Sequence, residues 1–325
     1  MIEQLRAFSY ERQRLGRQAP TAARALSDVI AVYSSHPTAP LALHARTQDL
    51  TGTKFRRLDV LRIPAMRQSI HMLPRKTAHL AHRATPAPPS DRKKRMKHFK
   101  FTEKRYAQLR AELLEIATEP LTLGELRERA GADPDELKGI SAQMTRDAEL
   151  VRVGAHGLRS NDLRYVRHEL APADPDEALA WLAGEYLRAF GPVRVKDFVW
   201  WAGTTATRAK QALAEHDTEE LDGGLLLLAG DAGAFEKAKP PKGAVDLLPK
   251  WDCLTMGYAP DGRERFALTK DCYDFRGDGR PVILVDGEAA GTWEKLEPQL
   301  FEKAGAKTRK AIDERIDAVR AFLDS

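Results

Sequence analysis

The stretch from residue 121 to residue 166 constrains the fold most, because residues with a fixed conformational role mark its helix boundaries. Helical spacing that starts at Leu123 ends at Gly131, and Asp133 followed by Pro134 is the N-cap and first-turn pair that begins a second helix. Two extended segments follow this second helix, Leu150–Val153 and Leu158–Val166. A helix–turn–helix followed by a β-hairpin is the order of elements in a winged-helix module.

The same order of elements is predicted on both sides of this stretch. On the N-terminal side, helical spacing that reaches Tyr33 is broken before Pro37, because proline disfavours helical conformation in the residue before it. A short helix at Leu41–Arg46 and a pair of strands within Asp59–Leu73, around Pro64, complete this unit. On the C-terminal side the expected elements are three helices and a strand: Ala178–Phe190, Val195–Ala202, Ala206–His216 and Leu221–Leu228.

Residues 241–325 show a different pattern. Strand-like segments are expected at residues 246–258, 266–270 and 281–285, Asp286-Gly287 is a two-residue hairpin turn, and Lys307–Phe322 is helical. The predicted fold class is therefore α+β, with three tandem winged-helix motifs followed by a small β-barrel and a C-terminal helix. The predicted boundaries are 1–85, 101–172 and 173–240 for the winged-helix units, 86–100 for a basic linker, and 241–325 for the β-barrel with its helix.

Positive charge is concentrated at one place in the chain. The formal net charge is +5, and residues 92–100 read RKKRMKHFK directly after a Pro-rich stretch. Such a run either neutralises DNA phosphates or is a solvated linker, and both interpretations remain open. A recognition helix presents its first turn to DNA, although a solvated helix face has the same composition. The candidate DNA contacts are Lys93, Lys94, Arg95 and Lys97 in the basic run, and Arg208 and Lys210 on the helix expected at 206–216.

Several classes of protein are excluded by what the sequence lacks. No apolar run approaches the roughly 18 residues of a membrane span, and the N-terminus does not have the basic-then-apolar order of a signal peptide. The two cysteines, Cys253 and Cys272, are too few for a disulfide framework or a zinc site. No metal-ligand set and no Gly-rich phosphate loop is present. We therefore expect a soluble cytoplasmic protein, associated with the nucleoid, without a metal, a membrane or a nucleotide cofactor.

Six segments, taken in order, resemble the AlkZ- and YcaQ-type DNA glycosylases, which are also described as winged helix DNA-binding domain-containing proteins. The segments are RQRL (Arg12–Leu15), LALHAR (Leu41–Arg46), AMRQSIHMLP (Ala65–Pro74), FGPVRVKDFVWWAG (Phe190–Gly203), LLPKWDCLTMGY (Leu247–Tyr258) and VDGEAAGTW (Val285–Trp293). The resemblance implies three winged-helix motifs and a β-barrel around duplex DNA. It also implies hydrolysis of the N-glycosidic bond of alkylated bases, such as N7-alkylated purines, or of bases in interstrand crosslinks.

The resemblance places the family's catalytic Gln-any-Gln or Gln-any-Asp pair just ahead of the LALHAR segment, where this chain reads YSSHP at residues 33–37. The two catalytic positions fall on Tyr33 and Ser35 or on Ser34 and His36. We prefer Ser34 and His36, because a neutral His accepts a proton from a water that the Ser hydroxyl holds. Ser34, Ser35 and His36 are therefore the candidate catalytic residues, and a helix C-cap is the alternative.

Five other side chains have a functional and a structural interpretation. His71 occupies the family's Thr-His position or is a core histidine, and Arg67, on the same strand face if the segment is extended, contacts phosphate or covers the sheet. Trp200 stacks on a base, while Trp201 beside it belongs to the core, or the two exchange roles. Asp252 is a turn residue or a salt-bridge partner within a β segment.

The sequence thus predicts a monofunctional DNA glycosylase whose partner is damaged duplex DNA. The main alternative is a non-catalytic DNA-binding protein, a regulator or a lesion sensor, that has lost the Gln-any-Gln pair. An interaction scaffold whose winged helices contact protein is the third possibility. A chain that wraps DNA with its own repeated units needs no second copy, so we expect a monomer.

Overall fold

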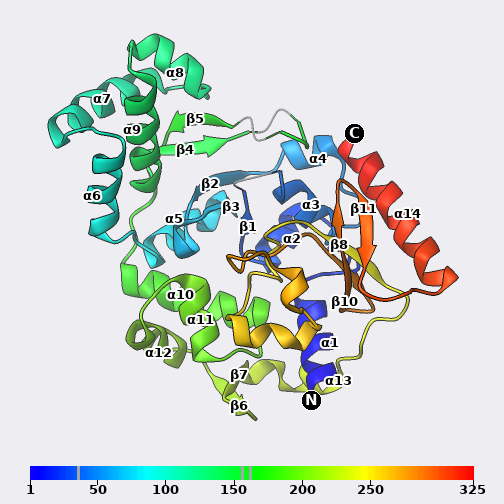
Figure 1. Cartoon of the computed structure of the whole chain (residues 1–325). Coiled ribbons are helices and arrows are strands. Elements are labelled where there is room, and N and C mark those ends of the chain that lie inside the picture. The colour runs from blue at the N-terminus through cyan, green and yellow to red at the C-terminus, as the bar shows by residue number, and fades with distance from the viewer. Residues whose placement is uncertain (35–36, 155–156, 161–162) are drawn as a thin grey trace.

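A five-stranded antiparallel sheet lies at the centre of the structure, a computed structural model that describes residues 1–34, 37–154, 157–160 and 163–325 (Figure 1). The strands, in spatial order, are β1 (Val32–Tyr33), β3 (Ile70–Pro74), β2 (Val60–Pro64), β4 (Leu150–Val153) and β5 (Arg164–Arg167). The hairpin β2–β3 belongs to the first predicted unit and β4–β5 to the second. The two hairpins join at the pair Arg62↔Arg152, so one sheet connects units that the sequence predicts as separate.

The N-terminal region contains one more strand and more helices than predicted. Its helices are α1 (Ile2–Arg12), α2 (Ala22–Asp28), α3 (Ala39–His44), α4 (Gly52–Arg56) and α5 (Arg75–Ala84). The helix expected to reach Tyr33 ends at Asp28, because Ile30 takes a left-handed φ of 70°. Val32 and Tyr33 then pair with Met72 and His71. Ser34 therefore follows a strand, and the helix C-cap interpretation is wrong for it.

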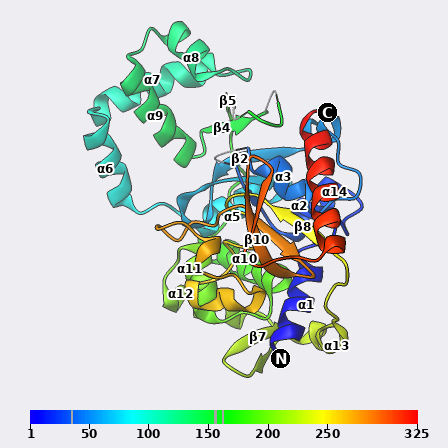
Figure 2. The same cartoon turned by 45° about the vertical axis from the view of Figure 1, so that its right-hand side comes forward.

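Residues 86–100, predicted as a linker, contain the exposed helix α6 (Pro89–His98). It leads into α7 (Glu103–Ile116), α8 (Leu123–Ala130) and α9 (Pro134–Arg146). The predicted end of α8 and the predicted start of α9 are confirmed. Gly131 ends α8 with φ 57°, and the Asp133 carboxylate accepts hydrogen bonds from the first free N–H groups of α9. Figure 2 shows α6–α9 set apart from the other helices, and their apolar faces form a small core of their own.

The third region packs against the first. Its helices are α10 (Pro175–Phe190), α11 (Val195–Ala202), α12 (Ala206–Ala214) and α13 (Ala232–Lys237), and α10 lies against α5 within the main core. The single strand expected at Leu221–Leu228 is instead a hairpin of β6 (Thr218–Leu221) and β7 (Leu225–Leu228). Gly223 and Gly224, both with positive φ, form its turn.

Residues 241–325 form an open sheet, and the predicted β-barrel is wrong. The order is β11 (Glu297–Leu300), β10 (Glu288–Glu294), β9 (Val282–Val285) and β8 (Val245–Leu248), with no pairing between β11 and β8. The predicted Asp286-Gly287 turn is confirmed, since both residues have positive φ between β9 and β10. Much of the expected strand content is turns and the short 3₁₀ helices η3 (Pro260–Phe266) and η4 (Lys270–Cys272).

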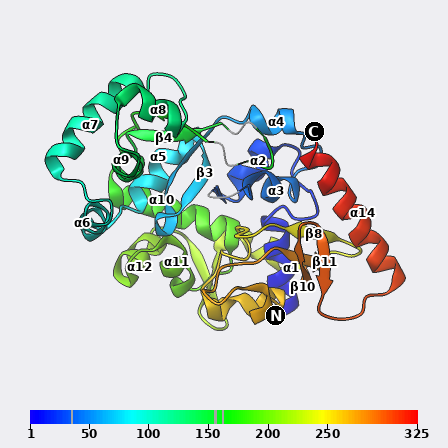
Figure 3. The same cartoon turned by 45° about the horizontal axis from the view of Figure 1, so that its top comes forward.

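The predicted C-terminal helix is confirmed as α14 (Ala306–Leu323), which covers one face of this open sheet (Figure 3). Ile312 and Ile316 pack with Leu247 of β8 and Ile283 of β9. Among the described residues, no helix is both long and apolar enough to span a membrane.

A buried ion pair ties the N-terminal region to the segment after β8. Arg46 Nη1 and Nη2 donate to the two carboxylate oxygens of Asp252 at 2.9 and 2.7 Å, and both side chains are fully buried. Gln13 adds a longer contact to Arg46 and donates to the Ala189 carbonyl at 2.8 Å. Asp252 is therefore a salt-bridge partner, as one interpretation held, although it lies in a turn segment and not in a strand.

We expect Asp252→Asn to lower the free energy of unfolding by about 3–5 kcal/mol, because it leaves the Arg46 guanidinium buried without a counter-charge. Urea denaturation measures the change. The control is Asp317→Asn, which removes an exposed partner of Arg320 and is expected to change stability by no more than about 0.5 kcal/mol. A loss below about 1 kcal/mol for Asp252→Asn would contradict the role of this pair.

His44 makes stability depend on pH. Its ring stacks on Phe322 with centroids 4.5 Å apart, and burial, together with Arg315 and Arg17, lowers its pKa to about 3. The unfolded chain binds a proton at His44 below its ordinary pKa of about 6.5, whereas the folded chain stays neutral there down to about pH 3. His44 therefore favours unfolding increasingly as the pH falls through this window.

The measurement is the difference in unfolding free energy between wild type and His44→Phe from pH 7 to pH 4. Below pH 6, wild type is expected to lose up to about 1.4 kcal/mol per pH unit more than the variant. Parallel pH profiles for the two proteins would show that His44 titrates in the folded state as it does in the unfolded chain.

Candidate active site and DNA-facing surface

Tyr33, at the end of β1, lies beside His71 of β3. Tyr33 and His71 pair across β1 and β3, and their ring centroids lie 4.5 Å apart. His71 is buried, its Nδ1 lies 2.9 Å from the Ser69 carbonyl oxygen, and burial lowers its pKa to about 3. With its pKa lowered this far the His71 imidazole is a weak base, and its ring is packed inside the protein. The core interpretation of His71 is confirmed.

Arg67 lies at the tip of the β2–β3 hairpin and not on a strand, so the expectation that it shares a strand face with His71 is wrong. Arg67 and Gln68 have φ of 53° and 58°, which turns the chain at η1 (Met66–Gln68). The Arg67 guanidinium donates to the Tyr33 hydroxyl and lies 3.8 Å from the centroid of the Trp200 ring. The tip also packs closely against Gly203, where a Cβ would lie 3.2 Å from Arg67 Cα.

Trp200 is held among cationic side chains and is only half-buried. Besides Arg67, the guanidinium of Arg263 on η3 lies 5.0 Å from its ring centroid, and Arg263 also stands 4.0 Å over Tyr273. We call Tyr33, Arg67, Trp200, Arg263 and Tyr273 the arginine–aromatic cluster. It joins β1, the hairpin tip, α11 and η3, and the sequence alone gave no signal for Arg263 or Tyr273.

The two tryptophans of α11 have different environments. Trp201 is 3% exposed and packs with Tyr186 and Phe190 at centroid distances of 4.7 and 5.5 Å, so its assignment to the core is confirmed. Near Tyr273, the turn at residues 274–278 carries Phe275, which is 92% exposed. An aromatic side chain two residues along the chain from Tyr273 is thus presented to solvent.

Ser34 is the candidate catalytic residue that the structure describes, since Ser35 and His36 lie outside the described residues. Its N–H donates to the Ile70 carbonyl at 2.9 Å, and its Oγ accepts a 2.8 Å hydrogen bond from Arg62 Nε. Arg62 also donates to the Gly154 carbonyl at 3.0 Å, and burial lowers its pKa to about 10. Within the described part of the chain the Ser34 hydroxyl donates no hydrogen bond, and its oxygen lies beside a positive charge.

The basic run lies on α6. Lys93, Lys94 and Lys97 are exposed, whereas Arg95 is half-buried and its Nε donates to Gln143 Oε1 at 3.0 Å. The helix places Lys94 and Arg95 beside Arg146 of α9 at one cavity, which sequence reasoning missed because Arg146 is distant in the chain. The only available signal was a basic residue in the last turn of α9.

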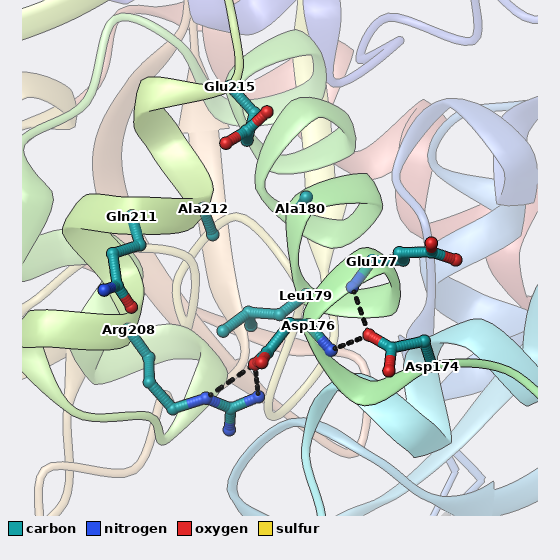
Figure 4. Close-up of a pocket in the computed structure, with 9 residues that line it drawn as sticks. All are labelled: Asp174, Asp176, Glu177, Leu179, Ala180, Arg208, Gln211, Ala212 and Glu215. Atoms are coloured by element: carbon teal, nitrogen blue, oxygen red, sulfur yellow. Dashed lines mark hydrogen bonds and ion pairs between the residues drawn. The ribbon is translucent and has the colours of Figure 1, made fainter.

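The structure separates Arg208 from these basic residues. Arg208 Nη2 lies 2.8 Å from Asp176 Oδ1 and lines a pocket between α10 and α12 (Figure 4). Carboxylates dominate this pocket: Asp174, Asp176, Glu177 and Glu215. Lys210 is exposed on the same helix. The first turn of α12 is therefore bordered by negative charge, which sequence spacing within the helix did not reveal.

Among the described residues, no three His, Cys, Asp or Glu side chains are placed to hold a metal ion. The cysteines Cys253 and Cys272 are both buried and unpaired, and burial raises the pKa of each thiol. What the described site offers is hydroxyl, aromatic and guanidinium groups, which position charged and aromatic ligands.

Comparison with known proteins assigns the chain to a family. No curated protein matches the sequence. Among solved structures, the Streptomyces sahachiroi DNA glycosylase AlkZ has a similar fold, with a TM-score of 0.76 and 20% sequence identity over 99% of this chain and 97% of that chain. Residues 26–322 match the family described as "DNA glycosylase AlkZ-like". Because this match spans nearly the whole chain, the protein belongs to the AlkZ-like DNA glycosylase family and is a hydrolase of N-glycosyl bonds in DNA.

Proposed function

We propose that this glycosylase releases alkylated bases, N7-alkylated purines or bases in interstrand crosslinks, from duplex DNA at the end of β1. The observation that carries the proposal is the position of Ser34. It stands where the family resemblance places a catalytic pair, directly after Tyr33 of the arginine–aromatic cluster. The half-buried Trp200 and the exposed Phe275 supply aromatic surface for an unstacked base.

In the proposed reaction a water attacks C1′ of the target nucleotide while the bond from C1′ to the purine N9 breaks. The electron pair of that bond leaves with the base, and a base alkylated at N7 thereby loses its positive charge and needs no general acid. The Ser34 hydroxyl donates its hydrogen to the water and positions it, and the His36 imidazole accepts the proton that the water loses. Ser35, between them, is the remaining candidate in this segment.

The proposed DNA contacts follow the surface charge. Lys93, Lys94 and Lys97 project from the exposed face of α6, where they are available to phosphates. Arg208 is committed to Asp176 in an acidic pocket, so the proposed interface leaves out the start of α12. The three helical regions, each followed by a hairpin, serve in this proposal as winged-helix units of a monomer that binds damaged duplex DNA without a nucleotide cofactor.

Base release from DNA containing 7-methylguanine, measured under single-turnover conditions, tests the proposal. We expect wild type to release the free base and His36→Ala to lower the rate by about 10²–10⁴-fold, because removal of a positioned base costs that much. Ser34→Ala is expected to slow release as well. The matched controls are His79→Ala and Ser90→Ala, which remove the same side-chain types from α5 and α6, outside the segment 33–37.

No release of any alkylated base by wild type would refute the proposed substrate. DNA binding without any base release would then favour the alternative of a DNA-binding protein or lesion sensor. If the control variants lost as much activity as His36→Ala, the assignment of Ser34 and His36 as catalytic residues would be contradicted.

A second prediction concerns Trp200 and Arg67, which are expected to act as one unit. Trp200→Leu and Arg67→Met are each expected to lower the rate of base release by about ten-fold, equal to about 1.4 kcal/mol. Because Trp200 holds the guanidinium that reaches Tyr33, the double variant should be no slower than the slower single variant. Rates that multiply, giving about a hundred-fold loss, would show that the two side chains act independently.

A further inference from the structure

A cavity of about 310 Å³ lies between the tip of the β2–β3 hairpin, helix α6 and the last turn of α9. Gln68 lines it from the tip, Lys94, Arg95 and His98 from α6, and Arg146 from α9. Gln68 is fixed there by a 2.6 Å hydrogen bond from its side-chain amide to the Thr85 carbonyl. The cavity therefore collects basic groups from segments that are far apart in the sequence.

The charges in this cavity are not balanced. The lining carries a single carboxylate, Asp91, which lies 3.5 Å from Lys94 Nζ. Arg95 donates to the Gln143 side-chain oxygen at 3.0 Å, and Arg146 donates to the Ala142 carbonyl at 3.3 Å. Both acceptors are neutral, and among the described residues neither guanidinium has a carboxylate within salt-bridge distance.

A nearby carboxylate accepts hydrogen bonds from other donors. Asp147, directly after α9, accepts hydrogen bonds from Tyr106 at 2.6 Å, from the Gln143 amide at 2.9 Å and from Arg92 at 3.3 Å. Burial lowers the pKa of both Arg95 and Arg146, and the positive charges of Arg95 and Arg152 lower that of Arg146 further, while Asp91 and Asp147 oppose the shift at both groups. Positive charges thus gather on two half-buried guanidinium groups whose hydrogen-bond acceptors are neutral.

This arrangement is suited to an anion with several acceptor oxygens. A guanidinium group binds phosphate oxygens through a planar pair of N–H donors, and such charge-assisted hydrogen bonds are about twice as strong as neutral ones. Gln68 directly follows Arg67 of the arginine–aromatic cluster, so the hairpin tip lines the cavity with one residue and contacts Tyr33 with the one before it. A DNA strand bound at the end of β1 is the natural source of the anion.

We propose that Arg95 and Arg146 together hold one backbone phosphate of the DNA strand in this cavity, with Lys94 and His98 at its rim. The inference deepens the proposed function, because it names a phosphate subsite that fixes the strand beside the end of β1. It concerns binding alone. Undamaged duplex DNA therefore tests it, whether or not the protein releases alkylated bases.

The experiment measures the affinity of the full-length protein for an undamaged 16-base-pair duplex by fluorescence anisotropy, over a series of KCl concentrations. Each phosphate contact contributes about 0.9 to the slope of log affinity against log salt. Arg146→Gln and Arg95→Gln are each expected to reduce the slope by about 0.9 and to weaken binding by about ten-fold at low salt. Because both groups hold the same phosphate, the double variant is also expected to lose only about 0.9.

The control is Arg309→Gln on α14, which removes an exposed positive charge far from the cavity in the sequence and should leave the slope unchanged. Unchanged slopes for the cavity variants would overturn the proposal. A loss of about 1.8 in the double variant would overturn the shared phosphate and indicate two separate contacts.

Inorganic phosphate, added at constant ionic strength, separates a strand phosphate from a free one. The proposal predicts a higher melting temperature of wild type in phosphate than in chloride, and no such rise for the double variant. Stabilisation by inorganic phosphate with normal DNA slopes in the variants would assign the cavity to a free anion and overturn the DNA contact. Since the substitutions relieve like-charge repulsion, the variants are expected to melt no earlier than wild type in chloride, and an earlier melting would mark Arg95 and Arg146 as structural.

Discussion

The fully buried pair of Arg46 and Asp252 is the interaction on which the arrangement of the rest depends. Its two ends come from segments that are 206 positions apart, and neither charge has water to replace its partner. Arg46 follows α3, which begins shortly after the candidate catalytic segment, while the chain beyond Asp252 leads to η3 and Arg263. Burying the two charges together therefore fixes the distance between the end of β1 and the arginine that faces Trp200.

The central sheet likewise fixes the β2–β3 and β4–β5 hairpins relative to each other. Its continuity from β1 to β5 rests on one residue pair, Arg62 and Arg152, between the β2–β3 hairpin and the β4–β5 hairpin. Arg62 also reaches across to Ser34, so the junction of the hairpins and the candidate catalytic segment share one side chain. The helices α6–α9 hold the far hairpin through their own small core, and the position of that core relative to Ser34 is set by this junction.

What the sequence predicted well was local. Gly131 marks the end of α8, Asp133 marks the start of α9, and Asp286-Gly287 marks the β9–β10 turn. Each of these residues determines the conformation of the backbone next to it. The errors concern long-range pairing. Nothing near Val32 and Tyr33 marks them as a strand, since their partner is β3, about 40 positions away. The open edge of the last sheet could not be foreseen for the same reason.

The candidate site was predictable to a similar extent. The resemblance drew attention to Ser34, Arg67 and Trp200, but their mutual geometry depends on the left-handed turn at Arg67 and on Arg263, which arrives from a 3₁₀ helix. The ion pair of Arg208 could not be predicted from the sequence either, because its partner Asp176 lies on a different helix.

The acidic pocket between α10 and α12 has a consequence for how the enzyme meets DNA. Carboxylates gather on that part of the surface and lysines on α6, so the net charge of +5 is unevenly distributed over these two places. Unevenly distributed surface charge interacts with the field of an approaching polyanion before any contact forms. Repulsion between DNA phosphates and the carboxylates beside α12 therefore disfavours an approach in which this helix faces the DNA.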